Sequence, residues 1–226
     1  MAFKPVALDK LEEMKLLSFA GLELIRAKTY LIYGESLSGK TALCLSILKK
    51  ALKDGIRVLL IDTEGKTRSR LQAIISEGVK KNLLTFYENN NMKDYTLPNF
   101  SEWLEKTVTE EKIDLIILDS IASPFTQLHH PKERAMLMKN VIGALRKVAQ
   151  DHDATAIVTT HTYRKYDSLD PGKIVPIGGE GIKFFSDTKI WLRLSPGDKR
   201  ILNILNNSTE QVIHIKGGLV EEEEKK

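Results

Sequence analysis

The octapeptide GESLSGKT at residues 34–41 has the residue types of a phosphate-binding loop, because it fits the pattern G-x-x-x-x-G-K-[ST] in full. It follows the apolar run TYLIY and precedes the helical run ALCLSILKKAL. Backbone N–H groups before a helix bind phosphate oxygens, so we expect residues 35–40 to wrap around a β-phosphate. Lys40 would reach the β- and γ-phosphate oxygens, and the Thr41 hydroxyl would bind Mg²⁺. The predicted nucleotide-binding residues of the loop are Gly34, Glu35, Ser36, Leu37, Ser38, Gly39, Lys40 and Thr41.

Two acidic residues, Asp119 and Glu64, lie at or just after the ends of other apolar runs. Asp119 ends the run IDLIILD, where a phosphate-binding loop needs a neighbouring carboxylate for the Mg²⁺ shell; a helix-capping aspartate is the alternative. Glu64 follows LLIDT, and a carboxylate there can orient or deprotonate an attacking water. A surface glutamate in a turn is the alternative. Asp62 competes for this role, but strand alternation places it on the same face as Glu64, with Glu64 nearer the open end.

Alternating strand-like and helix-like segments must position these residues. Apolar runs predict strands at 29–34, 56–63, 83–88, 113–120 and 155–160. Helices are predicted at 39–53, 67–79, 98–111 and 132–151. Near-continuous apolar strands are typical of a parallel sheet covered on both faces, so we expect an α/β protein with a mostly parallel central sheet flanked by helices.

The C-terminal third has a different pattern. Residues 161–181 contain four glycines and two prolines and show no helix or strand period, so a long functional or disordered loop is expected. Segments 187–194, 201–207 and 211–217 alternate and are joined by the short turns SPGDK and NSTE. They predict a C-terminal antiparallel extension of the sheet.

Composition favours one domain. The chain has 226 residues, of which 42% are hydrophobic, and we expect a single core domain at 1–220 followed by a charged, disordered tail at 221–226. No apolar run approaches the roughly 20 residues of a membrane helix. Cys44 is the only cysteine, which excludes an internal disulfide and favours a cytoplasmic location. The net charge of +4 permits a nucleic-acid partner without requiring one.

Taken in order, these segments resemble the RecA/RadA recombinase family, and most closely its short, RadB-like archaeal RadA paralogues. VLLIDTEGKTRSRL looks like the recombinase strand that carries the catalytic glutamate, and DLIILDSIASPF looks like the Walker B strand and the start of the first DNA-binding loop. AIVTTHTYRK is similar to the strand that enters the second DNA-binding loop, and GGEGIKFFSDTKIWLRL is similar to the exit from it. The resemblance covers roughly residues 20–217.

The resemblance implies a RecA-like P-loop ATPase that uses ATP and Mg²⁺. Lys40 and Thr41 would bind phosphate and Mg²⁺. Glu64 would activate water, and Asp119 would hold Mg²⁺ through its shell. His161 stands where the family has a glutamine that senses the γ-phosphate, which a histidine can do by hydrogen bonding. The alternative is a strand-end histidine satisfied by the backbone.

Some positions match the family less well. Arg70 would lie over the adenine, in a segment one residue shorter than the family's. Leu37 replaces the usual middle glycine of the loop. The chain begins almost at the ATPase core, and FAGL at 19–22 does not match the Phe-to-Ala motif that links recombinase subunits. We therefore expect firm ATP binding with weak hydrolysis, and a helper's role more than strand exchange.

Two loops are candidates for nucleic acid, at 123–135 and 162–179. The second combines cations and aromatic residues, which suit single-stranded DNA through phosphate contacts and base stacking. Its predicted DNA-binding residues are Tyr163, Arg164, Lys165 and Lys173. An ordinary surface loop is the alternative.

Three functions remain open from the sequence. The first is an ATPase of homologous recombination and DNA repair that binds single-stranded DNA and assists a RadA-like recombinase or another repair protein. The second is a KaiC-like regulatory ATPase that acts through protein partners without DNA; its typical paired glutamates are absent, since Gly65 follows Glu64. The third, a small P-loop kinase, fits the antiparallel C-terminal strands poorly. A homo-oligomer is compatible with the first two.

Overall fold

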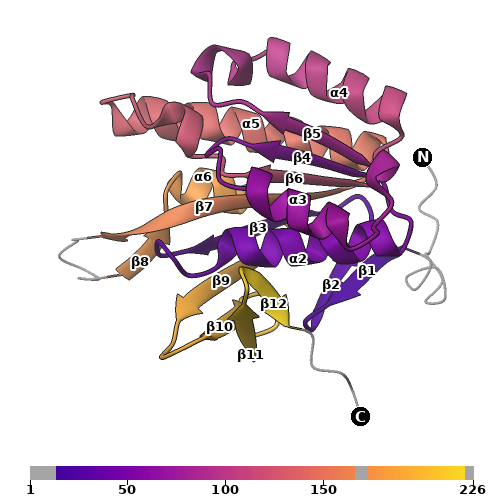
Figure 1. Cartoon of the computed structure of the whole chain (residues 1–226). Helices are drawn as coiled ribbons and strands as arrows, with labels where there is room; N and C mark the ends of the chain where they lie inside the picture. Colours follow the sequence, from indigo (N-terminus) through magenta and orange to yellow (C-terminus); the bar gives the residue numbers. More distant parts are fainter. Residues whose placement is uncertain (1–13, 166–172, 222–226) are drawn as a thin grey trace, which may run out of the picture.

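The computed structural model describes residues 14–165 and 173–221 and contains one large mixed sheet (Figure 1). Its strands follow the order β12-β11-β10-β9-β3-β7-β6-β4-β5, and β8 pairs with β7 off this path. Adjacent strands are parallel from β9 to β5 and antiparallel from β12 to β9. The parallel-paired strands are β3 (Thr29–Gly34), β4 (Val58–Asp62), β5 (Leu84–Glu88), β6 (Leu115–Asp119), β7 (Thr155–Lys165) and β9 (Thr188–Leu194). The antiparallel extension adds β10 (Lys199–Ile204), β11 (Thr209–Lys216) and β12 (Leu219–Glu221).

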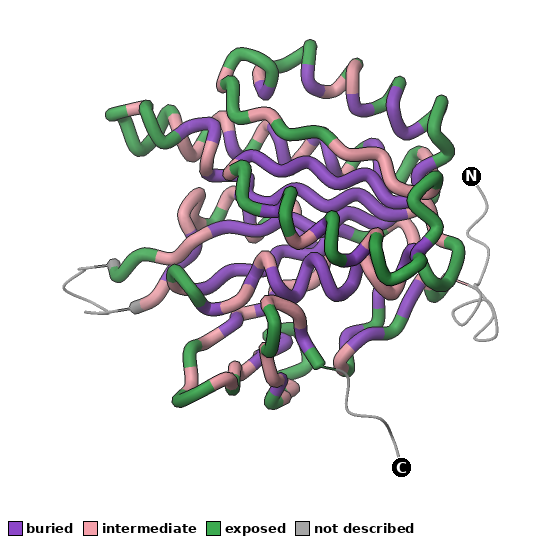
Figure 2. Tube along the Cα trace, viewed as in Figure 1, coloured by how far each residue is buried: buried purple, intermediate pink, exposed green. Residues whose placement is uncertain are grey.

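Helices cover both faces of this sheet. One face carries α2 (Lys40–Lys53) and α3 (Arg68–Ser76), and the other carries α4 (Asn99–Glu111), α5 (Pro131–Asp151) and α6 (Gly179–Phe184) (Figure 1). Each face has its own hydrophobic cluster, and the central strands are buried between the two (Figure 2). Short 3-10 helices lie in the connections at Lys81–Leu83, Met92–Tyr95 and Ser123–Phe125. Within the described ranges, no helix is long and apolar enough to cross a membrane.

The predicted fold class is confirmed: a mostly parallel sheet flanked by helices, with an antiparallel C-terminal extension. The expected loop at 161–181 was partly wrong. β7 continues to Lys165 and pairs antiparallel with β8 (Lys173–Pro176), Tyr163 standing opposite Val175. Pairing between distant segments therefore outweighs the weak local strand pattern of this polar stretch.

An N-terminal hairpin, β1 (Lys15–Phe19) and β2 (Leu22–Ile25), was not predicted. Its two-residue turn is Ala20–Gly21, and both residues have positive φ values, 45° and 70°. That geometry is the type I′ turn that fits the twist of a tight hairpin. FAGL is thus a turn, and its Phe19 and Leu22 are buried in the core beside α2.

The C-terminal boundary also differs slightly from the prediction. Glu221, the first residue of the expected tail, is the last residue of β12. Residues 222–226 lie outside the described part of the chain.

Candidate nucleotide-binding site

The phosphate-binding loop connects the end of β3 to the start of α2 and is packed against the C-terminal strands. Gly39 precedes the helix with a φ of 97°, which a glycine adopts without steric cost. A Cβ atom at this position would lie 2.1 Å from Cδ1 of Ile215 on β11. A Cβ at Gly34 would lie 2.2 Å from the carbonyl oxygen of Leu192 on β9. Both glycines therefore allow a close approach between the loop and strands β9 and β11.

Two other loop residues have unusual environments. Leu37 has a φ of 64° and is 84% exposed. Ser38 is fully buried, and its Oγ has no hydrogen-bond partner within the described residues. A buried hydroxyl without a partner is costly, so this position is suited to a ligand that brings hydrogen-bonding atoms into the loop.

The ammonium group of Lys40 is held over the loop. Its Nζ donates to the carbonyl oxygens of Gly34 at 3.0 Å and Glu35 at 2.8 Å, and lies 3.4 Å from Nδ1 of His161. Burial lowers the pKa of Lys40, while the nearby carboxylates of Asp119 and Glu64 act in the opposite direction. A buried cation in a phosphate-binding loop is well placed to neutralise an anionic ligand.

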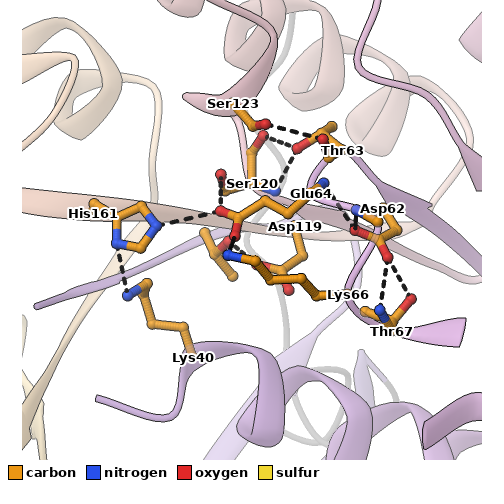
Figure 3. Close-up of polar contacts among 12 residues, drawn as sticks. Lys40, Asp62, Thr63, Glu64, Lys66, Thr67, Asp119, Ser120, Ser123 and His161 are labelled. Carbon is orange, nitrogen blue, oxygen red and sulfur yellow. Dashed lines mark hydrogen bonds and ion pairs between the residues drawn. The ribbon is translucent and has the colours of Figure 1, made fainter. Parts of the chain in front are cut away.

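Glu64 accepts hydrogen bonds from three side chains (Figure 3). Its Oε1 receives the Ser120 hydroxyl at 2.9 Å and lies 3.3 Å from Nε2 of His161, and its Oε2 receives Nζ of Lys66 at 2.7 Å. Hydrogen bonding from His161 is the main reason that the pKa of Glu64 lies well below its usual range; Lys66 and Ser120 add to this and burial opposes it. The neutral imidazole with its proton on Nε2 satisfies both contacts of His161, donating to Glu64 and accepting from Lys40.

Asp119 lies at the carboxyl end of β6 and is almost completely buried. The Thr159 hydroxyl donates a short hydrogen bond to its Oδ1. Burial raises the pKa of Asp119, and hydrogen bonds from Thr159 and Thr41 counteract part of this effect. The carboxylate is therefore poorly solvated, which favours an arriving cation.

Asp62 has a different environment from its competitor Glu64. Its Oδ1 accepts from the backbone N–H groups of Glu64 and Gly65, both at 2.9 Å. Its Oδ2 accepts from the N–H of Thr67 at 2.8 Å and from the Thr67 hydroxyl at 2.7 Å (Figure 3). Asp62 thus fixes the turn after β4, and this turn presents Glu64.

Most of the predicted site residues line one cavity of about 230 Å³. The predicted residues in its lining are Ser36, Leu37, Gly39, Lys40, Thr41, Arg70, Glu64, Asp119 and His161. Gly34, Glu35 and Ser38 belong to the loop but not to this lining. The strand register explains the convergence, because Asp62 stands opposite Asp119 and Gly34 opposite His161 at the carboxyl ends of parallel strands.

The lining also contains residues that the sequence analysis missed: Ala42, Lys66, Arg200, Ile215 and Gly218. Lys66 was detectable in principle, because it is two residues from Glu64. The last three belong to the C-terminal strands and their turns, whose position over the loop has no local signal in the sequence.

The DNA-binding candidates lie outside the cavity, on the β7–β8 hairpin. Tyr163 and Arg164 are exposed, and the backbone of Lys165 pairs with that of Lys173. The hairpin starts next to the nucleotide site, since the N–H of Ile177 donates to the carbonyl oxygen of His161 at 2.8 Å. It extends away from the main sheet (Figure 1). Residues 166–172 of the predicted loop lie outside the described residues.

A protein-family model described as an AAA domain matches residues 21–166, which include the loop, Glu64, Asp119 and His161. The chain belongs to the AAA-domain family. An AAA domain is a P-loop ATPase domain, so the general prediction of an ATP-binding P-loop protein is confirmed at this level.

The sequence of this AAA-domain protein is similar to those of archaeal DNA repair and recombination proteins. The DNA repair and recombination protein RadB of Methanococcoides burtonii is 28% identical over 178 residues, which are 75% of this chain and 76% of the relative. RadB of Methanosphaera stadtmanae is 28% identical over 160 residues, 68% of this chain and 67% of the relative. These matches confirm the predicted resemblance to RadB-like RecA/RadA paralogues.

A solved structure shares the fold of this AAA domain. The KaiC-like protein PH0186 of Pyrococcus horikoshii OT3 has a TM-score of 0.64 and 18% identity, with 88% of this chain and 91% of that chain covered. The likeness places the sheet and its helices in the RecA/KaiC-like P-loop fold.

The residues of this AAA domain fit ATP and Mg²⁺. The buried Ser38 hydroxyl without a partner, the Lys40 ammonium and the start of α2 suit a polyphosphate. Thr41 and Asp119 would hold Mg²⁺, which usually takes one or two protein oxygens and completes its shell with phosphates and water. No cluster of three His, Cys, Asp or Glu ligands occurs in the part of the chain that the structure describes.

Proposed function

We propose that the protein is an ATPase of homologous recombination and DNA repair that hydrolyses ATP slowly, binds single-stranded DNA and assists a main recombinase. One observation carries the proposal: Lys40, Glu64 and Asp119 meet His161 in one cavity, and His161 lies on the strand that continues into the β7–β8 hairpin. The similarity to proteins named DNA repair and recombination protein RadB supports the biological setting.

The chain's own groups divide the work of hydrolysis. Lys40 and the N-terminus of α2 would bind the phosphates, while Thr41 and Asp119 would hold the metal. ATP supplies the phosphoanhydride bond that is broken. Glu64 orients the attacking water and accepts its proton. Because three donors already stabilise the Glu64 carboxylate, it is a weak base, and we therefore expect slow turnover.

Single-stranded DNA would bind along the β7–β8 hairpin. The exposed ring of Tyr163 offers a surface for base stacking, and Arg164 offers a phosphate contact. The backbone hydrogen bond from Ile177, the residue after β8, to His161 connects the end of the hairpin to the nucleotide site. DNA binding would therefore respond to the nucleotide. A RadA-like recombinase or another repair protein in the cytoplasm would be the protein partner, and self-association is compatible with this role.

The first test measures ATP hydrolysis with and without single-stranded DNA, for the wild type and for Lys40→Ala. We expect slow hydrolysis that DNA changes and that Lys40→Ala abolishes. DNA binding is followed against salt concentration, because phosphate contacts give a falling log–log dependence. If DNA neither binds with a clear salt slope nor alters turnover, the repair proposal fails.

Two further variants test the assigned roles. Glu64→Gln should bind ATP and hydrolyse it roughly 100- to 10,000-fold more slowly, the usual range for loss of a general base. Glu88→Gln is a matched control, because Glu88 pairs with Arg68 outside the cavity lining. The double variant Arg164→Ala/Lys165→Ala should weaken DNA binding and leave ATP binding intact. Unchanged DNA affinity would place the DNA site elsewhere.

A regulatory ATPase that acts through protein partners is the second candidate, favoured by the fold that this chain shares with a KaiC-like protein. It predicts ATP-dependent binding of a protein partner and no salt-dependent DNA binding. The first test therefore separates the two candidates.

A further inference from the structure

The lining of the nucleotide cavity has more positive charge than the phosphate-binding loop alone provides. It includes four cations, Lys40, Lys66, Arg70 and Arg200, against the two carboxylates of Glu64 and Asp119. A polyphosphate remains anionic even when Mg²⁺ is bound, so an excess of cations suits it. Lys66 is already paired with Glu64, whereas Arg200 has no acidic partner within 4 Å among the described residues.

Arg200 reaches the cavity from a strand that is paired on both sides. It lies in β10 and pairs with Leu194 of β9 on one side and Ile213 of β11 on the other. Both neighbouring strands touch the loop, β9 through Leu192 and β11 through Ile215. The sheet therefore fixes the position of Arg200 relative to the phosphate-binding loop.

Arg200 and His161 approach the phosphate-binding loop from opposite sides. β7 and β9 flank β3 on opposite sides. His161 therefore approaches the loop from one side, and Arg200, on the strand beyond β9, approaches it from the other. A nucleotide held by Lys40 would lie between them.

The guanidinium group of Arg200 is only partly satisfied. Its Nη1 donates to the carbonyl oxygens of Gly197 at 3.1 Å and Lys199 at 2.6 Å, which orients the plane of the group. Its Nε is buried and has no hydrogen-bond partner among the residues that the structure describes. An orphaned buried donor on a charged group is costly, and an anionic ligand would satisfy it.

We propose that Arg200 binds the phosphate chain of the nucleotide in the same subunit as Lys40. This inference rests on the proposed ATP binding and adds a residue to that site. Its consequence is that one subunit provides both the lysine of the loop and a second cation from the C-terminal strands. A single subunit would then hold ATP without a cation from a neighbouring copy.

The competing explanation is that Arg200 only caps the turn between β9 and β10. Arg200→Ala removes both roles, whereas Arg200→Gln keeps an amide donor for the turn carbonyls and removes the charge. Lys199→Ala is the matched control: it removes an exposed cation from the adjacent position, whose side chain points to the other face of the strand and is absent from the cavity lining.

The experiment measures, by titration calorimetry, the dissociation constants of MgATP, MgADP and AMP for the full chain. Melting temperature and molecular size are recorded for each variant. We expect both Arg200 variants to bind MgATP and MgADP about ten- to a hundredfold more weakly, the range for loss of a charge-assisted hydrogen bond. AMP should be affected less, and Lys199→Ala should match the wild type.

Two results would overturn the inference while leaving ATP binding in place. One is a folded Arg200→Gln protein with wild-type affinity for MgATP. The other is an equal loss for all three nucleotides together with a lower melting temperature, which would assign Arg200 to the turn alone. If Arg200→Ala does not fold, Arg200→Gln decides. If the wild type binds no nucleotide, the inference fails together with the proposed function.

Discussion

Nε2 of His161 lies 3.3 Å from Oε1 of Glu64. This contact connects the turn after β4 with β7, the strand that continues into the β7–β8 hairpin. Glu64 follows β4 and faces the nucleotide cavity. His161 lies in β7, two residues before the exposed ring of Tyr163. Through this contact, hydrogen bonds connect the phosphate-binding loop to the β7–β8 hairpin, so a change in the bound phosphates would alter the surroundings of β7. Such a path couples two sites only if the nucleotide alters it, which can be tested.

We expect His161→Ala to make DNA affinity independent of the bound nucleotide, because the link between Glu64 and β7 is lost. His161→Gln should keep the coupling, since an amide can still donate to Glu64 and accept from Lys40. Single-stranded DNA binding is measured with ATP, with ADP and without nucleotide. His214→Ala is the control, because His214 pairs with Asp198 outside the cavity lining. Persistent nucleotide dependence in His161→Ala would contradict the coupling.

The same variant changes stability in acid. The pKa of Glu64 is lowered in the folded protein, mainly by His161. A lowered carboxyl pKa stabilises the fold above the unfolded pKa of about 4.3, and this contribution is lost as pH falls through the folded value. Without His161 the folded pKa of Glu64 rises toward the unfolded value, so this stabilising contribution becomes smaller. We expect the acid-unfolding midpoint of His161→Ala to shift upward, and circular dichroism against pH measures it.

Lys66 donates a hydrogen bond to Oε2 of Glu64, the carboxylate oxygen that His161 does not contact. Lys66→Ala removes the contact with Oε2 of Glu64, so the pKa of Glu64 should rise and the carboxylate should become a better base. We expect a several-fold faster ATP hydrolysis at unchanged ATP affinity. Arg68→Ala is the control, since Arg68 pairs with Glu88 and does not line the cavity. Slower hydrolysis with weaker ATP binding would mean that Lys66 acts on the phosphates instead.

Much of this site follows from the sequence for a simple physical reason. Each core strand is an apolar run, and Glu64, Asp119 and His161 come at or just after the end of such a run. Parallel strands bring their carboxyl ends to one edge of a sheet, where the phosphate-binding loop also lies. The order of motifs thus predicts which side chains meet, before any contact is known.

The parts that were not predicted depend on contacts between distant segments. β7 and β8 form a hairpin because TYRK pairs with KIVP, although neither has a strong strand pattern. Arg200 enters the cavity only because β9 and β11 pack against Gly34 and Gly39. The β1–β2 hairpin is different, since its alternating apolar residues and Ala20–Gly21 turn were a readable local signal.

Asp62 should be essential for the shape of the site without taking part in hydrolysis. Its carboxylate accepts four hydrogen bonds, so Asp62→Asn replaces one acceptor by a donor facing existing donors. We expect a loss of about 1–3 kcal/mol in the free energy of unfolding, measured by urea denaturation. Hydrolysis should also fall, because the turn that presents Glu64 is loosened. Wild-type stability in Asp62→Asn would refute this structural role.

Asp119 presents the opposite case, a carboxylate proposed to help hold Mg²⁺ whose charge is disfavoured by burial. Burial raises its pKa, so folding favours the protonated acid. The stability that this group contributes is therefore present below the unfolded pKa of about 3.9 and is lost as pH rises through the folded value. The ionised carboxylate of Asp119 is therefore poorly stabilised by its buried surroundings.

Asp119→Asn removes this charge and retains an oxygen that can accept from Thr159. Without nucleotide or metal we expect the variant to melt at a higher temperature than the wild type at neutral pH, by about 2–4 °C for each kcal/mol relieved. The advantage should shrink in acid, where the wild-type carboxyl is protonated. In MgATP the order should reverse, because only the wild type retains the negative charge that attracts Mg²⁺. Calorimetric scans at two pH values, with and without MgATP, give all four comparisons of the variant with the wild type. A variant that is less stable than the wild type in every condition would show that Asp119 stabilises the fold.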